Sequence, residues 1–279
     1  MAARLARHAG SCYGVQRALD LANGLLEEGR SASTLGPLIH NPIVVAELAD
    51  NGIAPVDDID AIETQTVIVR SHGISPELSD ELAARGFDVI DATCPHVARA
   101  QLGAASLAKD GCHVLVVGEA GHPEVEALVA YARRNGADVD VVSSPSDIPS
   151  GLGERVGVVV QTTQTEGMLD QVLSELDRMG IVPTVRNTIC SATQDRQEAA
   201  AELARTVDAM VVIGGKNSSN TTRLAEICAQ ECPITLHIEP PDELDMALLG
   251  ECGSVGVTAG ASTPEDQIEV VMERLGASS

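Results

Sequence analysis

Three cysteine-bearing turns recur along the chain at near-equal intervals. Cys12, Cys94 and Cys190 each come shortly before a stretch that can form a helix. Cys94 follows Cys12 by 82 residues, Cys190 follows Cys94 by 96 residues, and 89 residues follow Cys190. This spacing predicts a weak internal threefold repeat, in which three similar units meet at one point.

The turn around Cys94 shows the pattern in detail. The residues before it, Phe87–Ile90, predict a buried strand, and those after it, Val97–Lys109, predict a helix. Pro95 suits the first position of that helix, where its missing N–H costs nothing. The positive end of the helix favours a thiolate, so the turn can hold either a reactive nucleophile or a metal ligand.

Predicted strands and helices alternate along the whole chain. Strands are expected at residues 33–38, 66–70, 87–90, 113–117, 139–142, 155–160, 185–189, 209–213, 234–238 and 254–257. Helices are expected from near 15 to 29 and at 43–51, 77–85, 97–109, 125–135, 166–179, 196–205, 221–230 and 265–275. Such alternation indicates parallel sheets of βαβ units, which bind ligands at the carboxyl ends of their strands. We therefore predict an α/β fold of three small parallel-sheet domains, formed by residues 13–93, by residues 94–187, and by residues 188–279 with 1–12.

Charge and hydropathy exclude several classes of protein. The formal net charge is −23, from 41 acidic and 18 basic residues, which argues against nucleic acid and anionic membranes as partners. No apolar run approaches the roughly 18 residues needed to cross a bilayer, and the first residues lack the apolar core of a signal peptide. We therefore expect a cytoplasmic protein, in which an anionic ligand must be held by local hydrogen-bond donors.

The seven cysteines are an odd number and include no Cys-x-x-Cys pair, which disfavours zinc ribbons and thioredoxin-like sites. Cys112, Cys228, Cys232 and Cys252 are interpreted as small buried residues. The three turn cysteines suit either zinc or three corners of a cubane iron–sulfur cluster. Three ligands leave one metal position open, as catalysis at a metal requires.

Three histidines, His40, His72 and His122, fall in loops that follow predicted strands or precede helices. Imidazole can bind an anion as a cation or as an N–H donor. One such histidine would be interpreted as a surface or packing residue, whereas three in matching loops indicate a ligand-binding role.

Two further loops have the composition of anion-binding loops. Lys216–Asn220 (KNSSN) and Gly260–Ser262 (GAS) combine short polar side chains with the N–H groups of a helix start. The alternative is that their Ser and Asn residues only cap helices.

Glu124 lies two residues after His122 at a predicted helix start. A carboxyl group near a metal and an anion can act as a proton donor, and the alternative is a favourable charge at the helix N-terminus. Thr162 and Thr163, in another strand-end loop, can relay protons or cap a helix.

Taken in order, these motifs resemble the 4-hydroxy-3-methylbut-2-enyl diphosphate reductase family of the non-mevalonate isoprenoid pathway. The matching segments extend over nearly the whole chain: Gly10–Val15 (GSCYGV), His40-Asn41, His72-Gly73, Asp91–Pro95 (DATCP), Gly121–Glu126 (GHPEVE), Gln161–Thr163 (QTT), Ile189-Cys190 with Asp195–Ala199, Lys216–Asn220 with Arg223–Glu226, and Thr258–Ser262 with Pro264. Each is weak alone, and their ordered combination is highly specific.

The resemblance implies three α/β domains in a pseudo-threefold arrangement around a central [4Fe-4S] cluster, one per chain. It implies that Cys12, Cys94 and Cys190 ligate the cluster and that one iron, without a cysteine, takes the allylic hydroxyl of the substrate. The implied diphosphate ligands are His40, His72, His122, Thr162, Ser218, Ser219, Asn220 and Ser262. Glu124 would supply protons, with His122 and Thr162 in the relay. The expected activity is an oxidoreductase that yields isopentenyl and dimethylallyl diphosphates, with single electrons from a ferredoxin or flavodoxin.

The chain departs from the family pattern at a few positions. Ser11 stands where the family has Phe before the first cysteine, and Gln164-Thr165 stands where it has Leu-Ser. None of these changes removes an implied ligand. Two alternatives to the reductase remain open: a zinc-dependent hydrolase that uses the same thiols, and a non-catalytic relative that keeps the cluster.

Overall fold

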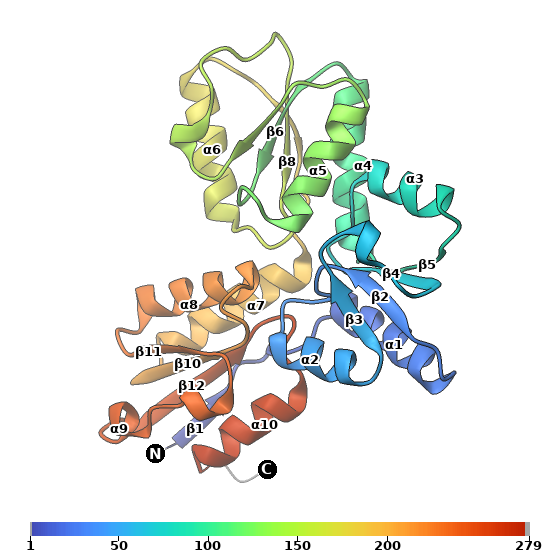
Figure 1. Ribbon diagram of the computed structural model, residues 1–279. Helices are drawn as coiled ribbons and strands as arrows, with labels where there is room; N and C mark the ends of the chain where they lie inside the picture. Colours follow the sequence, from blue (N-terminus) through green and yellow to red (C-terminus); the bar gives the residue numbers. More distant parts are fainter. Residues whose placement is uncertain (1, 277–279) are drawn as a thin grey trace. The chain divides into compact units, whose positions relative to one another are not determined.

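The computed structural model describes residues 2–276, which form two compact units (Figure 1). The first unit comprises residues 2–16, 39–47 and 191–276, and the second comprises residues 17–38 and 48–190. Among the described residues, no helix is both long and apolar enough to cross a membrane.

Three parallel sheets of four strands each confirm the predicted α/β class. The first sheet has the order β3 (Ile53–Val56), β2 (Ala32–Leu35), β4 (Thr66–Val69), β5 (Asp88–Asp91). The second has the order β7 (Val139–Val142), β6 (His113–Val117), β8 (Val156–Val160), β9 (Thr184–Arg186). The third has the order β11 (Thr235–Ile238), β10 (Ala209–Ile213), β12 (Ser254–Ala259), β1 (Ala2–Leu5). The first two sheets belong to the second unit, as do the helices of the crossovers between their strands, except that residues 42–47 of α2 belong to the first unit.

The α-helices are α1 (Tyr13–Glu27), α2 (Pro42–Asp50), α3 (Pro76–Ala84), α4 (Pro95–Lys109), α5 (Pro123–Arg134), α6 (Glu166–Arg178), α7 (Ser191–Ala204), α8 (Ser219–Glu231), α9 (Met246–Leu249) and α10 (Glu265–Arg274). Three short 3₁₀ helices occupy Ile59–Ala61, Pro145–Asp147 and Pro241–Glu243.

The three sheets share one topology. In each, the first strand of the repeat lies between the second and third, and the fourth lies beyond the third. The fourth strands are β5, β9 and β1, and each is followed by a cysteine turn and then by a helix, α4, α7 or α1. The internal repeat is therefore one of topology, and β1 completes the third sheet from the other end of the chain.

Successive side chains of the central strands point to opposite faces of the sheet, and helices pack against both faces. In β10, Ala209, Val211 and Ile213 pack with α10, whereas Met210 and Val212 pack with α7 and α8. The strands of the second sheet alternate in the same way between α4 and α5 on one face and α6 on the other. Burying such an aliphatic side chain contributes about 1.5–3 kcal/mol, so these Val, Ile and Leu side chains form cores without aromatic residues.

The prediction of a buried strand before Cys94 is wrong. β5 is an edge strand, hydrogen-bonded only to β4, and its residues are mostly exposed. The strands before the other two cysteine turns, β1 and β9, are also exposed edge strands. The conformation of an edge strand depends on pairing with its neighbour as much as on its own apolar residues. The apolar residues within Phe87–Ile90 therefore predicted a strand correctly but predicted too much burial.

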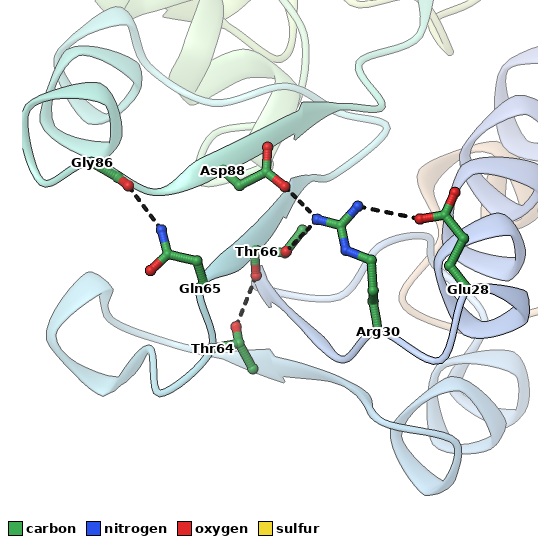
Figure 2. Close-up of polar contacts among 7 residues, drawn as sticks. All are labelled: Glu28, Arg30, Thr64, Gln65, Thr66, Gly86 and Asp88. Carbon is green, nitrogen blue, oxygen red and sulfur yellow. Dashed lines mark hydrogen bonds and ion pairs between the residues drawn. The ribbon is translucent and has the colours of Figure 1, made fainter.

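The amino ends of strands β4 and β5 carry stabilising contacts between polar groups (Figure 2). Arg30 bonds the Thr66 hydroxyl (2.8 Å) and the carboxylates of Glu28 (3.3 Å) and Asp88. The Gln65 amide bonds the Gly86 carbonyl at 2.9 Å. These groups satisfy one another, whereas ligands of parallel sheets bind at the opposite, carboxyl ends of the strands. The domain boundaries expected at residues 93/94 and 187/188 stay predictions.

Candidate active site

Each turn cysteine occupies the same position relative to a helix. Cys12, Cys94 and Cys190 are the residues directly before α1, α4 and α7. Cys94 has extended N-cap geometry without a side-chain capping hydrogen bond, and Pro95 is the first helical residue, as predicted. All seven cysteines lie in the described part of the chain; none is in a disulfide, and the three turn cysteines are half-buried.

The backbone N–H of each turn cysteine is bonded to the loop after the neighbouring strand. The N–H of Cys12 donates to Ala261 (3.1 Å), that of Cys94 to Ser71 (3.0 Å) and that of Cys190 to Thr162 (3.0 Å). The accepting residue is itself a predicted substrate-binding residue, Thr162, or directly precedes one, Ser262 or His72. Within its own unit, each thiol-bearing turn is therefore fixed to a loop with a predicted ligand-binding side chain.

The four remaining cysteines have the packing role predicted for all of them, although Cys252 is half-buried rather than buried. Cys112, Cys228 and Cys232 are buried in apolar cores, and Cys252 packs half-buried against another. Burial raises the pKa of the Cys228 thiol to about 12. Such a thiol is protonated at neutral pH, as expected for a cysteine packed in an apolar core.

Glu124 is held in the second unit by a pair of hydrogen bonds. It is the second residue of α5, directly after Pro123, and its side chain is 1% exposed. Its Oε1 accepts the backbone N–H of Thr162 (2.6 Å) and its Oε2 accepts the Thr162 hydroxyl (2.8 Å). Because both carboxyl oxygens have donors, burial does not leave them unsatisfied.

The environment of Glu124 shifts its titration toward neutral pH. Burial raises the pKa of its carboxyl group to about 7, against the opposing effect of the two Thr162 hydrogen bonds. Near pH 7, comparable fractions of the carboxyl are protonated and ionised. A group in that state can give up a proton and regain it, as general acid catalysis requires.

Two histidines lie beside one another in the same unit. The rings of His72 and His122 are edge-to-face, with centroids 5.6 Å apart. The Nδ1 of His122, the N-cap residue of α5, accepts the backbone N–H of Glu124 at 3.1 Å. In the neutral ring the proton of His122 is therefore on Nε2, where it can be donated to an anion.

Glycine is required directly after His72. Gly73 has φ of +71°, and a Cβ there would lie 2.3 Å from Nε2 of Gln101 and 3.3 Å from the Thr93 methyl group. The loop thus turns sharply and packs against the residue before Cys94, so that His72 is placed by a tight backbone contact.

In the first unit, the loops of His40 and Ser262 are bonded together. The Ser262 hydroxyl donates to the His40 carbonyl (2.9 Å), and the Asn41 amide donates to the Ser262 carbonyl (2.9 Å). The other atom of that amide, Oδ1, accepts the N–H groups of Ile43 and Val44 at the start of α2. Asn41 therefore fixes the position of both loops.

The first turn of α8 contains a buried amide without a partner among the described residues. Ser218 caps the helix through the N–H of Thr221, as the alternative interpretation of the KNSSN loop proposed. Asn220, however, is 4% exposed, and neither Nδ2 nor Oδ1 bonds any described residue. Buried amides are rarely left unbonded, so Asn220 is suited to a ligand. Lys216, by contrast, is exposed and bonds the carboxylate of Glu243 (2.7 and 2.9 Å).

Sequence reasoning did not single out Asn41 and Gln161 as site residues. Gln161 is fully buried, and its Oε1 accepts the N–H of Glu119 at 2.9 Å in the loop before His122. A Cβ on Gly118 would lie 2.8 Å from that oxygen, so a glycine is required there. In the sequence, Asn41 directly follows His40 and Gln161 directly precedes Thr162, and this adjacency was the signal that could have identified them as site residues. The structure gives the positions of all predicted site residues, whose roles remain predictions.

These features define an α/β protein in which thiols at helix starts lie beside loops whose side chains are predicted to bind an anion and donate protons. The chain belongs to the family described as LytB protein, whose model matches residues 3–276.

Relatives resemble the chain over nearly its whole length. The 4-hydroxy-3-methylbut-2-enyl diphosphate reductase of Citrifermentans bemidjiense is 46% identical over 275 residues, covering 98% of this chain and 96% of the relative. A solved structure of (E)-4-hydroxy-3-methyl-but-2-enyl diphosphate reductase, the terminal enzyme of the non-mevalonate pathway, is 43% identical with a TM-score of 0.72, covering 99% of both chains. The solved structure of the E-1-hydroxy-2-methyl-but-2-enyl-4-diphosphate reductase from Plasmodium falciparum is 23% identical and has a TM-score of 0.90. The match covers 98% of this chain and 87% of that one, which supports the fold.

Proposed function

We propose that the chain is an oxidoreductase that converts (E)-4-hydroxy-3-methylbut-2-enyl diphosphate into isopentenyl and dimethylallyl diphosphates. Relatives that match it from end to end bear the name of this reductase. One observation in this chain carries the proposal: the N–H of each turn cysteine is bonded to a loop with a predicted substrate-binding side chain. Metal ligands and substrate ligands then share the same short segments.

Proteins of the LytB family depend on iron–sulfur chemistry. The thiols of Cys12, Cys94 and Cys190 fit such a group, because they are half-buried, lie at helix starts and are not in disulfides. We propose that they ligate one [4Fe-4S] cluster per chain and leave one iron for the substrate hydroxyl. When bound, the cluster supplies electrons one at a time and a Lewis-acidic iron.

We assign the binding of the diphosphate to neutral hydrogen-bond donors and to histidines, which can be neutral or cationic, rather than to a clamp of arginines. In this proposal its oxygens are bound by the side chains of His40, His72, His122, Thr162, Ser218, Ser219, Asn220 and Ser262. The buried amide of Asn220 supports the assignment, because a ligand oxygen would satisfy Nδ2. Such donors bind an anion locally although the chain as a whole carries a charge of −23.

The reaction breaks one C–O bond and consumes two electrons and two protons. One proton leaves with the hydroxyl group as water, and the other is added to an allylic carbon. We assign the supply of protons to the Glu124 carboxyl, with the Thr162 hydroxyl and the Nε2 of His122 in the relay. The pKa of Glu124 near 7 and its 2.8 Å hydrogen bond to Thr162 support this role.

The electron donor is proposed to be a ferredoxin or flavodoxin, which delivers electrons singly. Because the chain is strongly acidic, an acidic donor is repelled overall and must dock through a local surface. We place the protein in the cytoplasm, whose reducing conditions keep such thiols available for metal.

Metal analysis and turnover together test the proposal. Anaerobically prepared protein should contain about four irons and four acid-labile sulfides per chain, and it should convert the hydroxylated allylic diphosphate with a strong one-electron reductant. Cys94→Ser should lose the cluster. Zinc without acid-labile sulfide would favour a hydrolase, and tight diphosphate binding without turnover would favour a non-catalytic relative.

A further inference from the structure

An arginine holds the turn that contains Cys94. Arg17 lies in α1, five residues after Cys12. Its Nη2 donates to the carbonyl of Asp91 (3.0 Å) and its Nη1 to the carbonyl of Thr93 (3.3 Å), the residue directly before Cys94. One guanidinium thus bridges two carbonyls of a single turn through its rigid, planar fork of donors, whereas a lysine would present a point charge on a flexible stem.

A second arginine holds the turn that contains Cys12. Arg196 lies in α7, six residues after Cys190, and is only 5% exposed. Its Nη2 donates to the carbonyl of Gly10 (2.8 Å), two residues before Cys12, and its Nη1 donates to Ala192 (2.8 Å) in the first turn of α7. A buried cation is therefore bonded next to the Cys12 turn.

The two contacts are equivalent in the repeat. The helix after one cysteine opens a repeat, and the next cysteine turn ends it: α1 opens the repeat that ends at Cys94, and α7 opens the one that ends at Cys12. In both, an arginine five or six residues after the first cysteine is bonded to carbonyls just before the second. This equivalence sets them apart from incidental surface contacts.

The repeat that ends at Cys190 lacks this contact, although α4 carries Arg99 at the same position. Arg99, five residues after Cys94, is exposed and bonds no described residue. The helix itself passes the turn closely, since a Cβ on Gly103 would lie 3.9 Å from the Thr188 methyl group. Neutral side chains hold this turn instead: Asn187 accepts the N–H of Ile189 (3.1 Å), and Thr188 accepts that of Val160 (3.1 Å).

We propose that Arg17 and Arg196 are positioning residues for the thiols of Cys94 and Cys12, and that Cys190 is the most weakly held of the three. The inference rests on the proposed function, because it concerns the cluster that these thiols would ligate. Partners of metal ligands typically change metal affinity about 10- to 100-fold. A guanidinium beside a cluster also favours its reduced, more negative state.

The order in which the thiols become accessible tests the proposal. Cluster-containing protein is treated with an iron chelator and iodoacetamide, and labelling of each cysteine is followed by peptide mass spectrometry. Cys190 should be labelled first. In Arg17→Met, which keeps the aliphatic stem, Cys94 should be labelled as early as Cys190, and iron release should be about 10- to 100-fold faster. Arg196→Met should do the same for Cys12.

The matched control is Arg99→Met, which should change neither the labelling order nor the release rate. Arg17→Lys should restore the reduction potential, because it keeps the charge, but should not restore slow iron release, because it loses the two-carbonyl bridge. A purely structural role would leave the potential of Arg17→Met unchanged and would contradict the proposal. So would equal labelling of the three thiols in the unmodified protein.

Failure of the inference can be told from failure of the proposed function. If the unmodified protein binds no iron and sulfide, the function is wrong. If it binds them and Arg17→Met behaves like Arg99→Met, only the inference is wrong. Arg196 is buried, so Arg196→Met is first compared with the unmodified protein by thermal unfolding; if it does not fold, the half-exposed Arg17 decides alone.

Discussion

Buried polar side chains lie at the carboxyl ends of both the second and the third sheet, and they differ in whether the chain itself supplies their hydrogen-bond partners. In the second sheet, both oxygens of Glu124 accept hydrogen bonds from Thr162. In the third, neither amide atom of Asn220 bonds a described residue. A buried group whose bonds are completed by the chain can keep an unusual protonation state. A buried group left incomplete is ready for a ligand, because the ligand supplies the missing bonds.

The largest expected effect is the loss of turnover when the carboxyl group of Glu124 is replaced by an amide. Glu124→Gln keeps the size of the side chain and a partner for Thr162 but cannot donate a carboxylic proton. We expect kcat to fall by about 10²- to 10⁴-fold, with the affinity for inorganic diphosphate unchanged. Glu126→Gln, on the exposed face of the same helix, is the matched control. Retention of more than a tenth of the rate by Glu124→Gln would remove Glu124 from the role of proton donor.

The next effect is on the pH dependence of stability. The pKa of Glu124 is raised from 4.5 to about 7 in the folded chain, so the unfolded chain loses this proton at lower pH. Stability is therefore lost as pH rises from about 4.5 to about 7. Between pH 5 and pH 8 this residue should lower the free energy of unfolding by about 2–3 kcal/mol. Urea unfolding of the protein and of Glu124→Gln at both pH values measures it; parallel pH curves would show that the carboxyl is not perturbed.

The smallest expected effect concerns the amide of Asn220, whose atoms bond no described residue. Asn220→Ala should weaken the binding of inorganic diphosphate about tenfold, because one buried donor is lost. It should leave the free energy of unfolding nearly unchanged, because the amide bonds no described residue. Calorimetric titration and urea unfolding separate the two quantities, with Asn217→Ala, exposed in the loop just before α8, as the control. A loss of stability with unchanged affinity would show that Asn220 is a structural residue.

All six central strands could be predicted from the sequence, whereas two of the six edge strands, β1 and β3, could not. The central strands β6 and β10 and the edge strand β7 have the bounds expected from their apolar runs between polar residues. β1 and β3 have only four residues each, and β3 contains Pro55, so neither shows an apolar run of its own. For such strands the pairing partner decides the conformation, and the partner of β1 lies at the far end of the sequence.

The sequence predicted which loops form the candidate site, but it did not predict the hydrogen bonds between them. The position of Glu124 after His122 indicated a proton donor, yet its burial and its bonds to Thr162, 38 residues away, follow from tertiary packing. Arg17 gave no signal, and Arg196 was noted only as part of a segment that resembles the family, since an arginine inside a helix is ordinarily a surface residue. Their contacts depend on segments 74 to 186 residues distant.

The pairing of the two chain ends in the third sheet has a consequence for biosynthesis. The turns of Cys94 and Cys190 bond residues that precede them, Ser71 and Thr162, so both can form while the ribosome is still at work. The turn of Cys12 bonds residues 259–263 through Gly10, Ser11 and Cys12. Of the three turn thiols, the first to be synthesised is therefore the last to be placed, and a three-thiol site cannot exist before residues 259–263 have been synthesised.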